Sequence, residues 1–304
     1  MAQVNLFLVG AMRAGSTSVA TWLAAHPQIF VGPIKEPNHF IVQLPKALYE
    51  PDPRFSLETY FEKEFPKPLH IAHVVAPVDY EKLYQNVDRE QRFLLDASAA
   101  YLAYPEAPSR IHAYNPSAKI LVILRNPMER MISHYKMNVG LGKEKRTFQQ
   151  IVREELAHYQ NGTLRWYDYM AMSFYDAGLE GFKQYFKEVM VLNFDDLKKN
   201  NPHIISKQVG SFLKIDFEDL ESIGHYNASH HVRLKSILRS GRHTWIKSVF
   251  SKNLSSALKR RVFRVFITKN EKAVSLDLLT QEHLQRVFRE HSSVYWSQET
   301  YKIR

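Results

Sequence analysis

The sequence contains no cysteine among its 304 residues. Without thiols the chain forms no disulfide and no thiolate-bound metal site, and this composition is compatible with a reducing compartment. The sequence also has no apolar run long enough to span a bilayer. Its N-terminus has no basic segment followed by a long apolar run. We therefore expect a cytoplasmic protein with no signal peptide and no integral membrane segment.

Acidic residues are absent from one long segment. Residues 225–270 contain no Asp or Glu but eleven Lys or Arg, which accounts for the net charge of +10 of the whole chain. Nucleic acid, a phosphorylated cofactor and anionic lipid all suit such a charge. The segment is either a solvated loop and helix face, the usual origin of a charge run, or a basic flap over an anionic ligand. Its basic residues are Arg233, Lys235, Arg239, Arg242, Lys247, Lys252, Lys259, Arg260, Arg261, Arg264 and Lys269.

The chain begins with a strand, a glycine loop and a helix start. Residues 6–9 form a continuous apolar run, which is typical of a strand buried on both faces of a parallel sheet. Gly10 and Gly15 end this pattern, and three hydroxyl residues, 16–18, follow. Any of these hydroxyls could cap the helix that the later apolar spacing predicts. This order of elements suits an anion held on backbone N–H groups at the positive end of a helix.

The glycine spacing is close to that of a nucleoside-triphosphate loop, with one departure. Where that motif requires Lys after the second glycine, this chain has Ser16. The cation of the loop is Arg13, two residues before Gly15. A loop without the lysine does not reach β- and γ-phosphates in the usual way. An ordinary glycine turn is the alternative interpretation.

Strands and helices alternate over the first two hundred residues. The predicted strands are residues 6–9, 29–31, 92–96, 119–124 and 189–194. The predicted helices include 57–64, 80–84, 109–114, 147–159, 167–186 with a break near Gly178, 204–213 and 281–295. Residues 33–40 read as a stiff loop because two prolines bracket a Lys-Glu pair. This alternation predicts an α/β fold with a doubly wound parallel sheet.

A second candidate anion site follows the most apolar strand. Arg125 stands at the end of residues 119–124, and Ser133 lies on the helix after it. An arginine fork and a hydroxyl beyond a strand end suit a phosphate monoester. Arg130 is either a third donor or a brace for the loop through a salt bridge, and we favour the brace.

The two motifs together resemble the sulfotransferases that use 3′-phosphoadenosine 5′-phosphosulfate. The first runs from Leu8 to Ser18 and the second from Leu124 to Tyr135. Other matching pieces, in order, are His26-Pro27, Lys35-Glu36-Pro37-x-His39-Phe40, Tyr101-Leu102, Phe194-Asp195-Asp196-Leu197, and Asn227-x-Ser229 with Arg233. The bacterial and heparan-sulfate-type branch is more similar than the small-phenol branch.

The resemblance implies a P-loop-like three-layer α/β fold, with a central parallel sheet flanked by helices. It implies one sulfotransferase domain over residues 1–304, with 225–270 as a basic flap or acceptor-side segment. It also implies a co-substrate, 3′-phosphoadenosine 5′-phosphosulfate (PAPS), a product, 3′-phosphoadenosine 5′-phosphate (PAP), and no metal. By position, the phosphosulfate would be held by Arg13, Ala14, Gly15, Ser16, Thr17 and Ser18. The 3′-phosphate would be held by Arg125 and Ser133, with Tyr175 near the nucleotide.

In the branch that this chain resembles, a glutamate in the loop of residues 33–40 is the base, which points to Glu36. Lys35 would hold Glu36 ionised or touch the sulfonate, and Arg13 would stabilise the leaving phosphate. His39 is the second candidate base, because histidine has a suitable pKa and the phenol-type branch uses one. A purely structural Lys35–Glu36 pair is the alternative. Heparan-type relatives carry a lysine where this chain has Ala97.

Two other functions stay open. One is a P-loop nucleotide kinase or phosphotransferase, which the absent loop lysine disfavours. Asp96 is the best aspartate for holding Mg²⁺ after a buried strand. The other is a non-enzymatic binder of nucleic acid or anionic membrane through residues 225–270. For the sulfotransferase we expect a hydroxyl, less favourably an amine, of a small metabolite, lipid or saccharide as acceptor, and no nucleic-acid partner. The sequence leaves the oligomeric state open.

Overall fold

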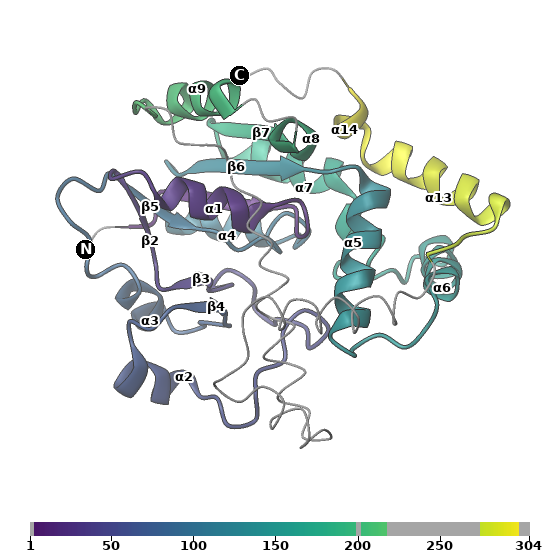
Figure 1. Cartoon of the computed structure of the whole chain (residues 1–304), viewed down its shortest axis with the longest axis horizontal. Helices are drawn as coiled ribbons and strands as arrows, with labels where there is room; N and C mark the ends of the chain where they lie inside the picture. Colours follow the sequence, from purple (N-terminus) through teal and green to yellow (C-terminus); the bar gives the residue numbers. More distant parts are fainter. Residues whose placement is uncertain (1–2, 199–201, 218–273, 298–304) are drawn as a thin grey trace, which may run out of the picture.

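The computed structural model describes residues 3–198, 202–217 and 274–297. Its centre is a five-stranded sheet in the order β2-β5-β1-β6-β7 (Figure 1). All four strand pairings in this sheet are parallel. The strands are β1 (Leu6–Gly10), β2 (Ile29–Val31), β5 (Phe93–Asp96), β6 (Lys119–Leu124) and β7 (Val189–Asn193). Helices lie on both sides of the sheet in Figure 1. The predicted α/β fold with a central parallel sheet flanked by helices is confirmed.

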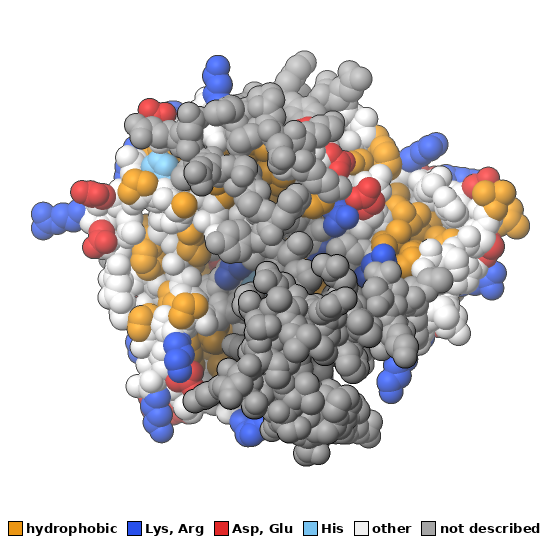
Figure 2. Space-filling model, viewed as in Figure 1, with side chains coloured by type: hydrophobic (Ala, Val, Ile, Leu, Met, Phe, Trp, Pro, Cys, Tyr) orange, Lys and Arg blue, Asp and Glu red, His pale blue; other side chains and the backbone are white. Residues whose placement is uncertain are grey.

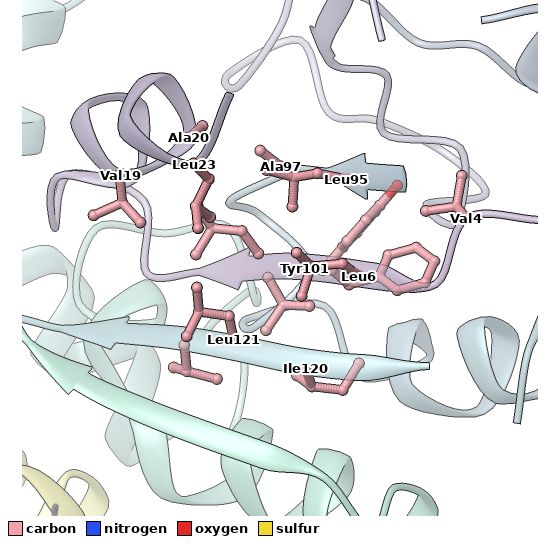
Figure 3. Close-up of a cluster of buried hydrophobic side chains, with 14 of the residues drawn as sticks. Val4, Leu6, Val19, Ala20, Leu23, Leu95, Ala97, Tyr101, Ile120 and Leu121 are labelled. Carbon is pink, nitrogen blue, oxygen red and sulfur yellow. The ribbon is translucent and has the colours of Figure 1, made fainter. Parts of the chain in front are cut away.

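The central strands are buried because both of their faces are covered. Every residue of β1 and β5 is buried, and so is β6 from Ile120 onward. Such strands are apolar throughout instead of alternating. In Figure 3, Val19 and Leu23 of α1 (Ser16–Ala24) come together with Leu6 of β1 and Leu121 of β6. This packing holds the start of α1 at the sheet.

The helices that follow the strands have well-defined starts. They are α4 (Ala107–Tyr114), α5 (Pro127–Gly140), α6 (Phe148–Gln160), α7 (Tyr175–Tyr185), α8 (Phe194–Lys198) and α9 (Pro202–Leu213). Helix α6 begins with a capping box, in which Thr147 and Gln150 satisfy each other's backbone N–H groups. Helix α5 begins with Asn126 as its N-cap and Pro127 in its first turn. The predicted helices are therefore present, with shifted ends.

One predicted helix is divided at a different residue. Residues 171–173 form a 3-10 turn, and α7 starts only at Tyr175 because Phe174 is extended. The prediction of a break near Gly178 is wrong, since Gly178 lies inside α7. A Cβ on Gly178 would lie 2.0 Å from the carbonyl oxygen of Leu102. This glycine allows a close approach of helix and loop instead of ending the helix.

The stiff loop predicted at residues 33–40 contains a short strand. β3 (Ile34–Glu36) pairs in parallel with β4 (Leu69–Ile71) in a separate two-stranded sheet. Asn38, in the left-handed region with φ 52°, ends this strand. Its side-chain amide donates to the carbonyls of Glu36 at 2.9 Å and Ala72 at 3.1 Å. The segment between β3 and β4 contains α2 (Leu57–Thr59) and a π-helical turn (Tyr60–Glu64), and α3 (Pro77–Lys82) follows β4.

The C-terminal described part packs on α5 and α6. Helix α13 (Leu278–His291) buries Leu284, Val287 and Phe288 against residues of those two helices, and the three helices lie together at one end of the molecule in Figure 1. Helix α14 (Ser293–Trp296) follows it, and its first N–H groups are capped by Asp176 of α7. The packing role predicted for the last helix is confirmed. The basic segment 225–270 lies outside the described residues.

Candidate functional site

The sheet brings the two predicted motifs to one edge. Because the five strands are parallel, their carboxyl ends meet there, and ligands of open α/β folds bind at that edge. β1 ends there in the glycine loop, and β6 ends there in Arg125. The two motifs are thus neighbours in space although more than a hundred residues separate them.

Helix α1 begins at Ser16 with Gly15 as its N-cap. Gly15 has φ 92°, a left-handed conformation that favours glycine. A Cβ at this position would lie 2.9 Å from the ring of Phe194. No side chain in the described part of the chain caps the helix start, so the prediction that a hydroxyl of residues 16–18 is the cap is wrong. Among the described residues, the first N–H groups of α1 have no side-chain partner, and N–H groups at the positive end of a helix can bind an anion.

Arg13 connects the two motifs. Its Nε donates to Oγ of Ser133 at 3.2 Å, and its carbonyl accepts from Nη1 of Arg125 at 3.2 Å. Arg13 also has a positive φ of 71°. Two guanidinium groups and a hydroxyl therefore lie beside the start of α1. Such a cluster suits an anion with more than one phosphate-like group.

Arg125 is fixed from two sides. Its Nε and Nη2 donate to Oε2 of Glu129 at 3.2 and 3.0 Å, and its guanidinium lies 4.7 Å from the ring centre of Phe194. The Phe194 ring thus contacts both Gly15 and Arg125. The sequence pattern alone assigns Phe194 no such role. Its position directly after β7 is the signal that could have suggested this role.

Tyr175 lies behind Arg125. Its hydroxyl donates to the carbonyl of Arg125 at 2.8 Å, and the side chain is fully buried. Burial raises the pKa of Tyr175, so the phenol stays protonated and remains a donor. Tyr175 therefore fixes the end of β6. Its predicted place near a nucleotide stays a prediction.

Arg130 is a brace, as predicted, although its described hydrogen bonds go to neutral groups instead of a salt-bridge partner. The side chain is completely buried. It donates to Oγ of Ser173 at 2.6 Å and to the carbonyl oxygens of Tyr169 at 2.5 Å and Met12 at 3.4 Å. Burial lowers its pKa to about 10, which still leaves it charged at neutral pH. It thereby ties the glycine loop to α5 and to the segment before α7.

Lys35 and Glu36 form an ion pair at the end of β3. Lys35 Nζ lies 2.6 Å from Oε1 of Glu36 and 3.5 Å from the carbonyl oxygen of Ala97. The two side chains are 13% and 12% exposed, so both are mostly shielded from water. Ala97 follows β5 directly, which puts this pair at the same edge of the sheet as the glycine loop. This ion pair is expected whether Glu36 is the base or only a structural partner of Lys35.

His39 belongs to an aromatic cluster. Its ring stacks on Tyr80 with centroids 4.2 Å apart, and its Nδ1 lies 2.8 Å from the carbonyl oxygen of Val74. A carbonyl only accepts, so Nδ1 carries the proton and Nε2 is the acceptor in the neutral ring. Burial lowers the pKa of His39. This ring is neutral at physiological pH and is held firmly by its neighbours.

Asp96, the last residue of β5, accepts hydrogen bonds from three neighbouring residues. Its carboxylate accepts from the hydroxyls of Tyr80 and Tyr101 at 2.9 and 3.0 Å, and from N and Oγ of Ser98 at 3.0 and 2.6 Å. Burial raises its pKa to about 6, and these hydrogen bonds oppose the rise. A carboxylate with four protein donors is a structural group. Its use here to hold Mg²⁺ would require breaking this network.

The described residues contain no candidate metal-binding cluster and no helix suited to span a membrane. Among residues 3–198, 202–217 and 274–297, no group of three or more His, Asp or Glu could hold a metal ion. In the same ranges, no helix has the length and apolar character needed to cross a bilayer. The predicted absence of a metal and the predicted cytoplasmic location stay predictions.

Figure 2 shows Lys and Arg side chains around the rim of one face.

Comparisons with known proteins agree with this arrangement. Mouse carbohydrate sulfotransferase 15 is 25% identical over 178 residues, which cover 52% of this chain and 31% of that protein. Human heparan sulfate glucosamine 3-O-sulfotransferase 6 is 44% identical over 46 residues, 15% of this chain and 14% of that protein. The chain thus spans about a third of the length of the first of these relatives.

A solved structure shows the same fold. The sulfotransferase from Alicyclobacillus acidocaldarius superposes with a TM-score of 0.58 at 24% identity, covering 79% of this chain and 97% of that chain. The sequence pattern described as the sulfotransferase family matches residues 5–219, which include both candidate anion-binding motifs and the Lys35–Glu36 pair. The chain belongs to the sulfotransferase family.

Proposed function

We propose that this enzyme transfers a sulfuryl group from PAPS to a hydroxyl of an acceptor and releases PAP. The observation that carries the proposal is the double contact of Arg13, with Ser133 on one side and Arg125 on the other. It joins an uncapped helix start to a second basic site at the same sheet edge. A donor with a 5′-phosphosulfate and a separate 3′-phosphate needs two such sites.

The residues at the glycine loop would hold the phosphosulfate. The donor supplies an activated sulfur whose leaving group is a phosphate. Arg13 and the first N–H groups of α1, from Ser16 to Ser18, would stabilise the negative charge that grows on the bridging oxygen. Ala14 and Gly15 have little or no side chain, so the backbone there could approach the phosphosulfate closely. A side chain on Gly15 would also collide with Phe194. Arg125 and Ser133 would hold the 3′-phosphate.

Glu36 is the proposed base. It would accept the proton of the acceptor hydroxyl, a contribution typically worth about 10²–10⁴-fold in rate. To do so it exchanges its contact with Lys35, whose ammonium can turn to the sulfonate. Lys35 already reaches the carbonyl of Ala97, at the position where the resembled heparan-type relatives have a lysine. His39 stays the second candidate, although its ring is held by Tyr80 and Val74.

A nucleotide kinase is less well supported. Ser16 replaces the loop lysine, and Asp96 is bound by Ser98 and two tyrosines. The names of the curated relatives, carbohydrate sulfotransferase and glucosamine 3-O-sulfotransferase, support a saccharide hydroxyl as acceptor. A lipid head group and a small metabolite are the other acceptors to be tested. We treat residues 1–304 as one sulfotransferase domain.

The experiment is a transfer assay with product identification. The protein is incubated with sulfur-labelled PAPS and separate saccharide, lipid and small-metabolite fractions of its source, and labelled products are identified by mass spectrometry. We expect a product heavier by one sulfuryl group, formed at least about 100-fold more slowly by Glu36→Gln. The matched control is Glu62→Gln on the exposed π-helical turn. Absence of any labelled product in all fractions, with PAP still bound, would contradict the proposed transfer.

A further inference from the structure

Met137 of α5 contacts the guanidinium group of Arg13. Arg13 Nη1 donates to the thioether sulfur of Met137 at 3.4 Å, and Arg13 Nε donates to Oγ of Ser133 at 3.2 Å. Ser133 and Met137 are four residues apart on α5, so they lie on the same face of that helix. Two nitrogens of one guanidinium are therefore held by two side chains one helical turn apart.

These two contacts fix the orientation of the Arg13 side chain. A guanidinium is planar, and its N–H donors point in fixed directions. A single hydrogen bond would leave the group free to turn about that bond, whereas contacts at Nε and Nη1 together define its plane. The main chain of Arg13 is held as well, because its carbonyl accepts from Nη1 of Arg125 at 3.2 Å. The direction of the guanidinium thus depends on both Ser133 and Met137.

Both of these acceptors are electrically neutral. A carboxylate in the place of Met137 would offset the charge of the guanidinium and compete with a phosphate for its N–H groups. A thioether is a weak acceptor without charge, and the unbranched methionine side chain adapts its shape to its neighbours. Met137 and Ser133 therefore orient the Arg13 cation and leave its positive charge in place.

We propose that Met137 is a positioning residue that aims Arg13 at the 5′-phosphate of the donor. The inference rests on the proposed function, in which Arg13 stabilises the negative charge that grows on the bridging oxygen. Such stabilisation depends on direction, because a donor is effective when it already points to the place where charge develops. Met137 acts through Arg13 and touches none of the reacting atoms.

The first test measures which phosphate contact is weakened in Met137→Leu. Leucine keeps the volume and apolar character of the side chain and removes the sulfur acceptor. By calorimetry, we expect the Kd values for PAP and for adenosine 5′-phosphate to rise by about 3- to 10-fold. The Kd for adenosine 3′-phosphate, which lacks the group that Arg13 would bind, should change by less than about twofold.

The matched control is Met128→Leu. Met128 is also a half-buried methionine of α5, but it packs against the cluster that α5 forms with α6 and α13. This variant should leave all three Kd values unchanged. A general loosening of α5 would instead weaken the binding of all three nucleotides, so the comparison separates positioning of Arg13 from a structural role of Met137.

The second test is a double-mutant cycle between Met137 and Arg13. In the Arg13→Ala background, Met137→Leu should cause no further rise in the Kd for adenosine 5′-phosphate, because the side chain on which Met137 acts is gone. The contact itself is checked without nucleotide by NMR of isotope-labelled methionine methyl groups. Arg13→Ala should shift the signal of Met137, which is assigned with Met137→Leu, and should leave that of Met128 in place.

Three results would overturn the inference alone. They are equal rises in Kd for all three nucleotides in Met137→Leu, an equal effect of this substitution with and without Arg13, and a Met137 methyl signal that does not respond to Arg13→Ala. Failure of the unmodified protein to bind PAP would instead overturn the proposed function.

Discussion

Arg13 Nε donates a hydrogen bond to Oγ of Ser133 at 3.2 Å, across a sequence separation of 120 residues. The carbonyl of Arg13 accepts from Arg125 at 3.2 Å. One residue of the glycine loop thus contacts both the strand end and the helix of the second motif. If the two motifs hold one ligand, a substitution in either motif should lower the affinity for that ligand. Each substitution should weaken the contact with a different phosphate group of the ligand.

Replacement of Arg125 should weaken PAP binding through its 3′-phosphate. A hydrogen bond to a charged group contributes about 1.5–3 kcal/mol, so Arg125→Ala should raise the Kd for PAP by about 10- to 100-fold. The Kd for adenosine 5′-phosphate, which lacks the 3′-phosphate, should change much less. Calorimetric titrations measure both values. The control is Arg110→Ala on α4, where the arginine pairs with Glu106 at the surface. Equal losses for the two ligands would contradict the assignment.

Gly15→Ala should disturb the loop in two ways. It places a Cβ 2.9 Å from the Phe194 ring and fixes a side chain at φ 92°. We expect a loss of about 1–3 kcal/mol in the free energy of unfolding, measured in urea, together with weaker PAP binding. The control is Gly142→Ala, at φ 72° with no heavy atom within 4 Å of the added Cβ. That variant carries the backbone strain alone, so an equal loss in both would show that Phe194 is not the obstacle.

Asp96 should make stability depend on pH in a defined direction. Its pKa is raised to about 6 in the folded protein, against about 3.9 when unfolded. The folded state therefore binds the proton more tightly, and the contribution of Asp96 to stability falls as pH rises from about 4 to 6. Asp96→Asn cannot titrate, and it loses one accepting oxygen equally at every pH. The comparison therefore rests on the pH dependence of stability and not on its absolute value.

The measurement is the free energy of unfolding of both proteins from pH 4 to pH 7. Relative to the unmodified protein, Asp96→Asn should gain roughly 1–3 kcal/mol between the two ends of this range. Glu155, whose pKa burial raises to about 7, contributes a fall of the same sign in both proteins and cancels in the difference. If the two proteins instead showed the same dependence of stability on pH, the pKa of Asp96 would not be raised by burial.

Single-turnover experiments should show which of Glu36 and His39 acts as the base. Glu36→Gln should slow sulfuryl transfer by about 10²–10⁴-fold with little change in the Kd for PAP, because Glu36 faces the acceptor side in our proposal. His39→Asn keeps a donor for the carbonyl of Val74 and should slow transfer by less than about tenfold. The reverse order, with Glu36→Gln active and His39→Asn inactive, would make His39 the base.

The two motifs proposed to bind the donor could be predicted because each is defined by residues close together in the sequence. The apolar run of β1, the two glycines and the hydroxyls lie within a dozen residues, and strand and helix periods place them at a sheet edge. The same holds for Arg125 after β6. Even there, the structure differs from the prediction for the helix cap: Gly15, and not a hydroxyl residue of 16–18, takes the N-cap position.

The remaining features depend on contacts between distant segments. β3 has three residues between prolines, and only its pairing with Leu69–Ile71 makes it a strand. That pairing also places His70 beside Lys35, which no local pattern indicates. Gly178 reads as a helix breaker, yet its role is set by the Leu102 carbonyl. Arg130 finds neutral partners in the glycine loop and in the segment before α7, which the helix sequence alone does not reveal.

Titration with PAP and with ATP–Mg²⁺ tests the central claim most directly. A site built from Arg13, the start of α1, Arg125 and Ser133 should bind PAP and give a clear rise in melting temperature, whereas ATP–Mg²⁺ should give little or none. Arg13→Ala and Arg125→Ala should each reduce the PAP effect. Stabilisation by ATP–Mg²⁺ but not by PAP would contradict the account and favour a phosphotransferase.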